Sequence, residues 1–381
     1  MKKASAFTFY LLYYAAIASL GPFIVLFYQQ LGFTGAQIGL LAGMSPLIML
    51  AGAPFWTGIA DATQRHRLTM SLTVAVVVVL VPIFPSFKAF GPVILLVALF
   101  SFFAAPITSF ADSATMSMLA GEKEMYGRVR LGGTIGWGLA APVAGMLIQI
   151  HGLRFAFWGY AALMFLALVV SQRFVFGQSA VGPSLQGSIR TLVTSRRWAL
   201  FLAMAFVSGM GFASINSYLL PYMEELKASK TTMGIALAIG TLFELPVLFF
   251  ADRLLKRFKA HGLLVLAMIV TGVRLLLYAA LKSPAGVLVV QTLNGLTYPA
   301  AWVAGVSYAD EHAPAGMSAT AQGLFGAMVS GFGAATGGFI GGLLLESTGG
   351  QGMFLVFGVV VLVGIAIITF IERRLPEEHH G

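Results

Sequence analysis

The stretch from Gly58 to Phe87, GIADATQRHRLTMSLTVAVVVVLVPIFPSF, begins with a polar, basic segment and continues with twenty residues that carry no charged side chain. An α-helix rises about 1.5 Å per residue, so about twenty residues cross the roughly 30 Å of a bilayer's hydrocarbon core. Residues 68–87 are therefore predicted to form a membrane-spanning helix, and the polar segment before them is predicted to lie at a membrane surface.

The rest of the chain has the same character. Hydrophobic residues make up 58% of its 381 positions and charged residues only 10%, whereas about a quarter of the residues in a soluble domain are charged. The apolar residues fall in blocks of helix-spanning length rather than in the short alternating segments of a transmembrane β-barrel. The composition therefore predicts an all-α membrane protein embedded in a lipid bilayer.

Twelve spans are predicted, and an even number places both termini on the same side. Their approximate ranges are 6–30, 36–60, 68–87, 91–118, 124–150, 153–175, 197–223, 231–251, 261–281, 284–309, 318–345 and 350–372. The basic start of the chain is interpreted as the beginning of the first span and not as a cleaved signal peptide, because no small-residue cleavage site leads into a soluble domain.

The distribution of Lys and Arg predicts which side that is. The side with the termini carries sixteen of them: Lys2, Lys3, Arg65, Arg67, Lys123, Arg128, Arg173, Arg190, Arg196, Arg197, Arg253, Lys256, Arg257, Lys259, Arg373 and Arg374. The other side carries five: Lys88, Arg154, Lys227, Lys230 and Lys282. The positive-inside rule therefore places both termini in the cytoplasm, for a protein of the plasma (inner) membrane. The formal net charge of +9 is explained by this topology, so no nucleic acid partner is expected.

A polar segment divides the chain in the middle. Residues 176–196 are rich in Gly and Ser and are interpreted as a cytoplasmic linker between an N-terminal bundle, 1–175, and a C-terminal bundle, 197–381. The second span ends in Ala60-Asp61 and the eighth in Ala251-Asp252, each followed by basic residues, and the two aspartates are 191 positions apart. Two such repeats with a site between them near mid-membrane are typical of transporters.

The two repeated exits are candidate gates. Asp61 with Arg65, and Asp252 with Arg253, place a carboxylate beside cations at the end of a helix. Such groups can form charge-assisted hydrogen bonds in one conformation and break them in another. The alternative is plain positive-inside topology, which explains the basic residues but not an aspartate in each half.

Asp112 and Arg130 are ionisable residues inside predicted spans, where each costs about 2.5–3.5 kcal/mol. They are equidistant from the turn at Gly121, nine residues away on either side, so the two antiparallel helices should hold them at one depth. Trp137 follows Arg130 by two helical turns on a similar face. A cation, an acceptor and a stacking ring suit a polar organic solute; the alternative is a structural salt bridge.

Glu244 and Arg274 are the corresponding residues of the second half. Burial disfavours the charged form of a carboxyl group, and a nearby arginine favours it, so a carboxylate that alternates between such surroundings can carry a proton. The alternative is a static Glu–Arg pair. Asn294 and Tyr298 add hydrogen-bonding groups from the tenth predicted span, although each could also serve a neighbouring helix.

No enzyme constellation, phosphate-binding loop or cluster with metal-ligand spacing occurs in the sequence. We therefore expect no catalytic residue, no cofactor and no metal. Without a nucleotide site, transport would be driven by an ion gradient or by the gradient of the solute itself.

The motifs also carry a family resemblance. Gly58-x-x-Asp61 with Arg65 resembles the signature loop between the second and third helices of the major facilitator superfamily. The run 126–137, YGRVRLGGTIGW, resembles the fifth helix of lactose permease and its relatives among nucleoside and phenylpropionate symporters. The resemblance implies a solute held by Asp112 and Arg130 and stacked on Trp137, with Arg274 involved in proton coupling.

The chain departs from that pattern in the second half. Asn294 and Thr297 stand where lactose permease has a His and a Glu, and Ser330 replaces a Lys. Glu244 and Asp112 remain as carboxylates within the spans that could carry a proton.

The combined prediction is a monomeric, proton-coupled symporter of a small polar or aromatic solute (a sugar, nucleoside or aromatic acid). It would have the major facilitator fold, twelve transmembrane helices in two pseudo-symmetric six-helix bundles, and would work by alternating access. One alternative keeps the fold and makes the protein a proton-driven exporter of drugs or sugars. A more remote alternative is a lipid scramblase or a membrane sensor.

Overall fold

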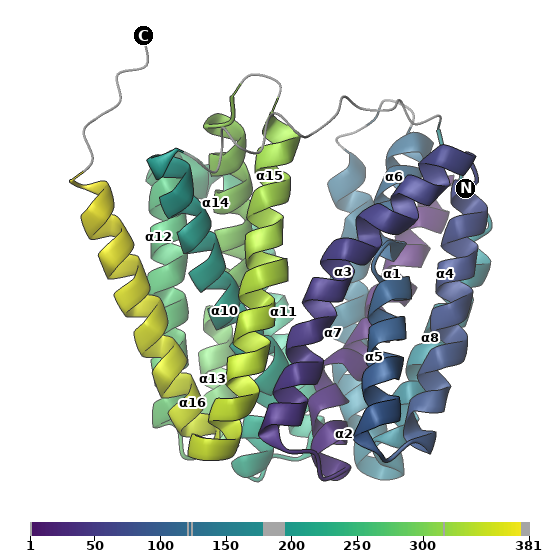
Figure 1. The fold of residues 1–381 in the computed structure, drawn as a ribbon, viewed down its shortest axis with the longest axis horizontal. Helices are drawn as coiled ribbons and strands as arrows, with labels where there is room; N and C mark the ends of the chain where they lie inside the picture. The colour runs from purple at the N-terminus through teal and green to yellow at the C-terminus, as the bar shows by residue number, and fades with distance from the viewer. Residues whose placement is uncertain (1, 120–121, 123–124, 178–194, 315–316, 375–381) are drawn as a thin grey trace.

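The computed structural model describes residues 2–119, 122, 125–177, 195–314 and 317–374, and it is built from helices (Figure 1). The first half contains α1 (Lys2–Leu20), α2 (Ile24–Gln30), α3 (Gly35–Thr63), α4 (His66–Leu80), α5 (Phe90–Ala104), α6 (Ile107–Leu119), α7 (Tyr126–His151) and α8 (Arg154–Ser171). The second contains α10 (Arg196–Glu225), α11 (Lys230–Phe249), α12 (Ala251–Ala280), α13 (Pro284–Val290), α14 (Tyr298–Glu311), α15 (Ser318–Gly326) and α16 (Ala334–Glu372).

Ten helices in the described ranges are long and apolar enough to cross a membrane. Each predicted span up to residue 281 overlaps one of them. The predicted span 284–309 is divided by the 3-10 helix Gln291–Leu296. The predicted spans 318–345 and 350–372 lie in one helical stretch, Ser318–Glu372, that bends at Gly349, where φ is 67°. Most of the predicted linker 176–196 lies outside the described residues.

Local sequence signals explain where several helices begin and end. Thr34 and Gln37 form a reciprocal capping box at the start of α3, which satisfies backbone N–H groups that have no partner within the helix. Ser229 accepts a hydrogen bond from the backbone N–H of Thr232 and caps α11 in the same way. Gly152 ends α7 with φ of 85°, a left-handed conformation that glycine adopts without steric cost.

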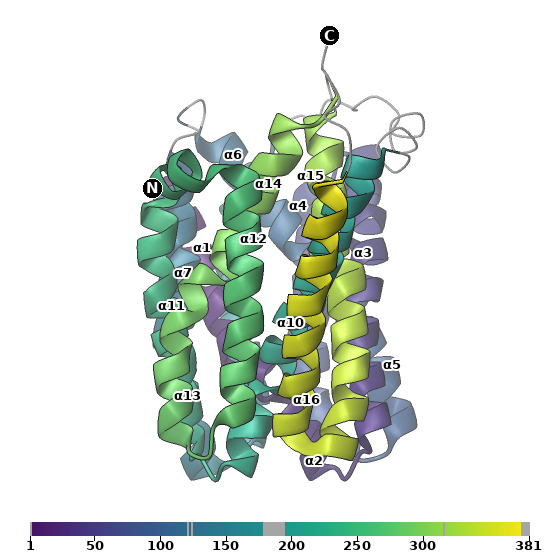
Figure 2. The same ribbon diagram turned by 90° about the vertical axis from the view of Figure 1, so that its left-hand side faces the viewer.

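The helices form two groups that lie side by side in Figure 1, α1 to α8 in purple to blue and α10 to α16 in teal to yellow. The helices of the first half of the chain therefore form one group, and the helices of the second half form the other. The start of α1 and the end of α16 lie at the same end of the molecule in both views (Figures 1 and 2). We call the opposite end, where α2 and α13 lie, the distal end.

The two groups contact each other through glycine-rich helix faces near the distal end. Gly39 of α3 lies against α16, where a Cβ added to it would be 2.5 Å from the Phe339 carbonyl oxygen. Gly145 of α7 and Gly234 of α11 form a matching close approach between the other pair of facing helices. Small residues let helix backbones approach closely, so this end of the interface is tightly closed.

Candidate functional site

An ion pair lies at the centre of the first half. Arg130 on α7 donates from Nη1 to both carboxylate oxygens of Asp112 on α6, at 3.1 Å each. The structure thus brings together the acid and base that the hairpin spacing placed at one depth. The Arg130 side chain is 40% exposed and that of Asp112 is 33% exposed, so the pair is partly accessible to solvent and is not fully buried.

Three tyrosine hydroxyls surround this pair. Tyr10 donates to Asp112 Oδ1 at 2.5 Å, while Arg130 donates to the hydroxyls of Tyr126 at 2.7 Å and Tyr14 at 3.2 Å. We call these five residues the first-half cluster. Tyr10 and Tyr126 were not identified from the sequence, although Tyr10 and Tyr14 are four residues apart and so share a face of α1.

Glycines on α7 hold the first-half cluster together. A Cβ at Gly136 would overlap the Leu11 backbone of α1, and one at Gly132 would lie 2.5 Å from the Phe7 carbonyl oxygen. The close approach of α7 and α1 brings Arg130 within reach of both tyrosines of α1. Trp137 lies half-buried on the same helix, two turns further along.

Arg274 on α12 is the centre of a second cluster and is only 2% exposed. It donates to Asn294 Oδ1 at 2.6 Å, to Thr297 Oγ1 at 2.9 Å, to the Tyr278 hydroxyl at 3.1 Å and to Gln291 Oε1. Gln291 and Asn294 are three residues apart in the 3-10 helix Gln291–Leu296, where side chains at this spacing eclipse one another, and Thr297 follows directly after its end. The 3-10 segment that divides the predicted tenth span therefore gathers the acceptors of this buried cation.

Glu244 on α11 completes the second-half cluster, the group formed by Glu244, Arg274, Tyr278, Gln291, Asn294 and Thr297. Its carboxylate accepts a hydrogen bond from Asn294 Nδ2 at 2.6 Å. No Glu244–Arg274 ion pair occurs among the described residues. The direct pair considered from the sequence is therefore wrong in this conformation, because Asn294 lies between the two charges and bonds to both.

Tyr298 begins α14 and directly follows Thr297 of the second-half cluster. The residue is 42% exposed, and its ring contacts Phe212 and stacks on Trp302 with centroids 5.3 and 5.8 Å away. These three rings form an aromatic wall beside the second-half cluster.

The helix that carries Arg130, α7, packs against the helix that carries Glu244, α11, since a Cβ added to Gly138 would lie 3.5 Å from the Thr241 side chain. The two clusters therefore lie on facing helices of the two halves.

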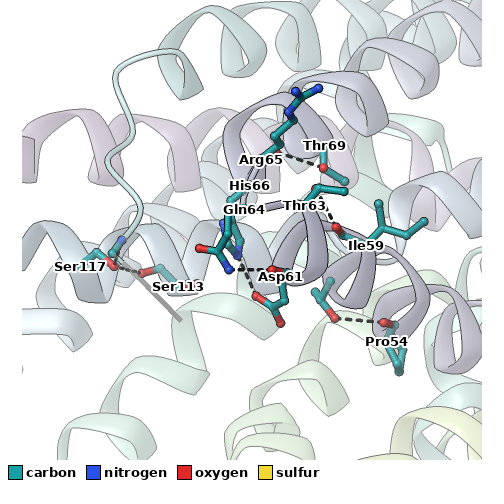
Figure 3. Close-up of polar contacts among 12 residues, drawn as sticks. Pro54, Ile59, Asp61, Thr63, Gln64, Arg65, His66, Thr69, Ser113 and Ser117 are labelled. Carbon is teal, nitrogen blue, oxygen red and sulfur yellow. Dashed lines mark hydrogen bonds and ion pairs between the residues drawn. The ribbon is translucent and has the colours of Figure 1, made fainter. Parts of the chain in front are cut away.

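The predicted gating residues lie at the end of the molecule that holds the termini. Asp61 accepts from His66 Nε2 at 2.7 Å, and Figure 3 shows the Arg65 side chain pointing away from Asp61. The structure therefore does not bring Asp61 and Arg65 together. His66 was not identified from the sequence. The reason is local geometry: Gln64 has φ of 55° and breaks the helix, so the next turn presents His66 to Asp61 instead.

The second predicted gate is more open. Asp252 and Arg253 are both exposed at the start of α12, and the Arg253 guanidinium lies over the Phe250 ring, 5.1 Å from its centroid. This pair, too, is not brought together as an ion pair within the described part of the chain.

The chemistry available here is recognition and proton exchange. No group of three or more His, Asp or Glu side chains suited to a metal ion occurs among the residues described. Carboxylates, the Arg130 guanidinium, amides and phenols can bind a hydroxylated or planar solute from both halves at once. The carboxylate of Glu244, held by a neutral amide, can take up a proton without breaking an ion pair.

Comparisons with known proteins give a consistent picture. The sequence model of the MFS_1 like family matches residues 5–356. The maltose permease of Geobacillus stearothermophilus is 27% identical over 371 residues, which cover 96% of this chain and 93% of that protein. The uncharacterized transporter YwbF of Bacillus subtilis (strain 168) is 23% identical over 376 residues, covering 97% and 94%.

Solved structures agree on the fold. The nucleoside transporter NupG matches with a TM-score of 0.86 at 16% identity, over 98% of each chain. An auto-inhibited peptide transporter of the POT family matches with a TM-score of 0.77 at 11% identity, over 100% of this chain and 98% of the other. At these identities the likeness concerns the fold alone.

Proposed function

We propose that this chain, which belongs to the MFS_1-like family of major facilitator transporters, is a proton-coupled symporter that imports a small polar or aromatic solute by alternating access. The observation that carries the proposal is that the two polar clusters lie on facing helices of the two halves, Arg130 on α7 and Glu244 on α11. Charged groups at membrane depth are costly unless they face a polar cavity or one another. A solute held between them would contact both halves.

The proposed architecture extends the ten apolar helices to twelve spans. The segment with α13 and α14 counts as one span despite its 3-10 turn, and the stretch Ser318–Glu372 counts as two because it bends at Gly349. This gives six spans in residues 1–175 and six in 197–381, joined by the linker 176–196. We further propose that the protein is a monomer in the inner membrane, with both termini in the cytoplasm and the distal end outside.

In this proposal the solute binds between the halves. Arg130 and Asp112 hold its polar groups, Trp137 and Tyr298 stack on its planar or apolar face, and Asn294 adds hydrogen bonds from the second half. The similar protein named as a maltose permease supports a sugar, the resemblance of residues 126–137 to nucleoside symporters supports a nucleoside, and the aromatic wall at Tyr298 also suits an aromatic acid.

Proton coupling is assigned to Glu244, with Arg274 as its charged partner, and Asp112 is the second carboxylate that could carry a proton. Glu244 accepts a hydrogen bond from Asn294, which in turn accepts one from Arg274. Any movement of α11 relative to the 3-10 helix therefore changes the surroundings of the carboxylate. A shift of this kind would load or release the proton as the halves rock.

The exits at Asp61 and Asp252 are proposed to act as gates. In the present conformation Asp61 is held by His66, while Arg65, Asp252 and Arg253 are exposed. These free charges could make new contacts when the ends of the halves that carry the termini approach each other.

Replacing Arg130 tests the proposal. Maltose, uridine and 3-phenylpropionate would be screened by thermal shift on the purified protein and then by uptake into proteoliposomes with an inward proton gradient. Arg130→Ala should abolish the shift and reduce uptake by roughly a hundredfold, since hydrogen bonds to charged groups contribute about 1.5–3 kcal/mol. Arg128→Ala, an exposed arginine of the same helix, is the matched control.

A second variant guards against misfolding. The double change Asp112→Asn with Arg130→Gln removes both charges and leaves neither unpaired, so it should fold while still failing to transport. Full uptake by this double variant would refute the assignment of the site. Uptake into proteoliposomes that needs an outward-directed proton gradient, and does not occur with an inward-directed one, would instead indicate the exporter.

A further inference from the structure

A cavity of about 720 Å³ lies at the distal end of the molecule, apart from the two polar clusters. It is lined by the end of α2, the turn between α7 and α8, and the turn between α10 and α11, so both halves contribute to it. None of the residues of the two polar clusters lines it. Its volume is within the range of about 300–1,000 Å³ found for small-molecule sites. We call it the distal cavity.

The polar lining of the distal cavity suits hydroxyl groups. Three carboxamides line it, those of Gln29, Gln30 and Gln149. A carboxamide both donates and accepts hydrogen bonds, as a hydroxyl group does. The carboxylate of Glu224 is held by the Lys230 ammonium at 2.6 Å, so this pair is neutral as a unit. Lys227 also lines the cavity, but it is exposed, so water screens its charge. The amides therefore suit a neutral polyhydroxylated molecule, and the lining disfavours a cation.

Apolar side chains complete the lining. Leu26, Ile148 and Leu153 are among the residues around the cavity. A sugar ring presents hydroxyl groups at its edge and C–H groups on its face, so it needs both kinds of surface. A wall of amides and leucines offers both within one cavity.

One lining residue also holds the two halves together. The side-chain oxygen of Gln149 on α7 accepts a hydrogen bond from the backbone N–H of Lys230, the first residue of α11, at 2.8 Å. A few residues deeper, Gly145 and Gly234 bring the same two helices into backbone contact. The distal cavity thus lies directly on the contact that closes this end of the interface.

We propose that the distal cavity is a binding site for a sugar-like solute, and that its occupancy releases α7 from α11. A bound hydroxyl can donate to the Gln149 oxygen, and water or a second hydroxyl can accept from the Lys230 N–H, so the closing hydrogen bond is replaced at little cost. A solute bound at this end shifts the equilibrium toward the open state by the difference between its binding free energies to the open and the closed states. That this solute is also the transported one rests on the proposed function.

The chain contains no cysteine, so a single introduced thiol reports on the cavity. Ala228 lines the cavity and is partly exposed, and Ala228→Cys changes little volume. The probe is the rate at which a hydrophilic maleimide alkylates this thiol, in the full-length protein in nanodiscs. The measurement is made in the Arg130→Ala background, with maltose, uridine or 3-phenylpropionate added.

Maltose should slow alkylation by roughly tenfold at saturation, a protection equivalent to about 1.4 kcal/mol. The additional changes Gln29→Ala and Gln30→Ala should abolish the protection. Gln351→Ala, which removes an exposed carboxamide near the same end but outside the cavity, should leave it intact.

Two results would overturn the inference. One is no protection by maltose in the Arg130→Ala background; if maltose then protects only when Arg130 is intact, the protection comes from movement driven by the central site. The other is protection by uridine alone. Because the readout is alkylation and not uptake, a failure of the proposed symport activity would leave it interpretable.

Discussion

Asn294 links the two charged side chains of the second-half cluster, Glu244 and Arg274. Its side-chain oxygen accepts from Arg274 at 2.6 Å and its nitrogen donates to Glu244 at 2.6 Å. A buried charge pair in direct contact would be hard to separate, whereas a neutral amide between the charges lets either one change without leaving the other unpaired. This arrangement is what a carboxylate needs if it is to exchange a proton during each cycle.

Glu244→Gln should therefore separate solute movement from proton movement. The glutamine keeps the size of the side chain and can still bond to Asn294, but it cannot release a proton. Solute counterflow between equal concentrations should remain near its original rate, while solute-driven acidification of proteoliposomes should fall to background. Glu311→Gln, at an exposed position at the end of α14, is the matched control.

Undiminished proton movement in Glu244→Gln would remove this residue from the coupling mechanism. Asp112 would then be the carboxylate to test next, as the acidic residue of the first-half cluster.

At the scale of elements, the sequence predicted what depends on composition and local spacing. The number of apolar residues between polar turns predicted the helices, and distance from a turn predicted that Asp112 and Arg130 would lie at one depth. It did not predict the 3-10 helix Gln291–Leu296, because apolar content is the same in either helix type. It also missed Tyr10, Tyr126 and His66, whose roles depend on which helices lie side by side.

The glycines of the facing helices show the same limit. Only the folded chain shows that Gly39 meets α16 and that Gly145 meets α11. These contacts join the two halves, so they concern the equilibrium between conformations as much as stability.

Gly39→Leu should force α3 away from α16 and disfavour the conformation that is closed at the distal end. Overpacking of a tight contact costs about 1–3 kcal/mol, so the open fraction should rise by roughly tenfold or more. The thiol of Ala335→Cys, at a position that is 7% exposed and close to Gly43, would report this as faster alkylation by a hydrophilic maleimide.

Gly91→Leu is the control for that experiment, since a Cβ at Gly91 of α5 meets nothing within 4 Å. An equal increase in alkylation with both variants would point to general loosening of the fold. No increase with Gly39→Leu would mean that the contact does not limit opening.

At the scale of the whole molecule, charge and contact are arranged along one axis. The end with the termini carries most of the basic residues and the Asp61–His66 pair, whereas the distal end carries the glycine contacts and the distal cavity. A conformation closed at the distal end has its polar clusters accessible only from the end with the termini. If that end faces the cytoplasm, the structure corresponds to the state in which an importer releases its solute.

Orientation in the membrane can be tested in whole cells because the chain lacks cysteine. Lys88→Cys and Lys282→Cys place one thiol per half near the distal end, and Arg173→Cys and Lys256→Cys place one per half near the end with the termini, all at exposed positions. Sixteen basic residues against five should fix the orientation strongly. An impermeant maleimide added to intact cells should therefore modify the first two almost completely and the last two only after lysis.

The reverse labelling pattern would mean that both termini lie outside the cytoplasm. The present conformation would then be open to the outside, and the distal cavity would face the cytoplasm. Modification of a distal-end thiol in one half and of the opposite thiol in the other would mean that the halves are inverted with respect to each other, which contradicts two parallel six-span bundles.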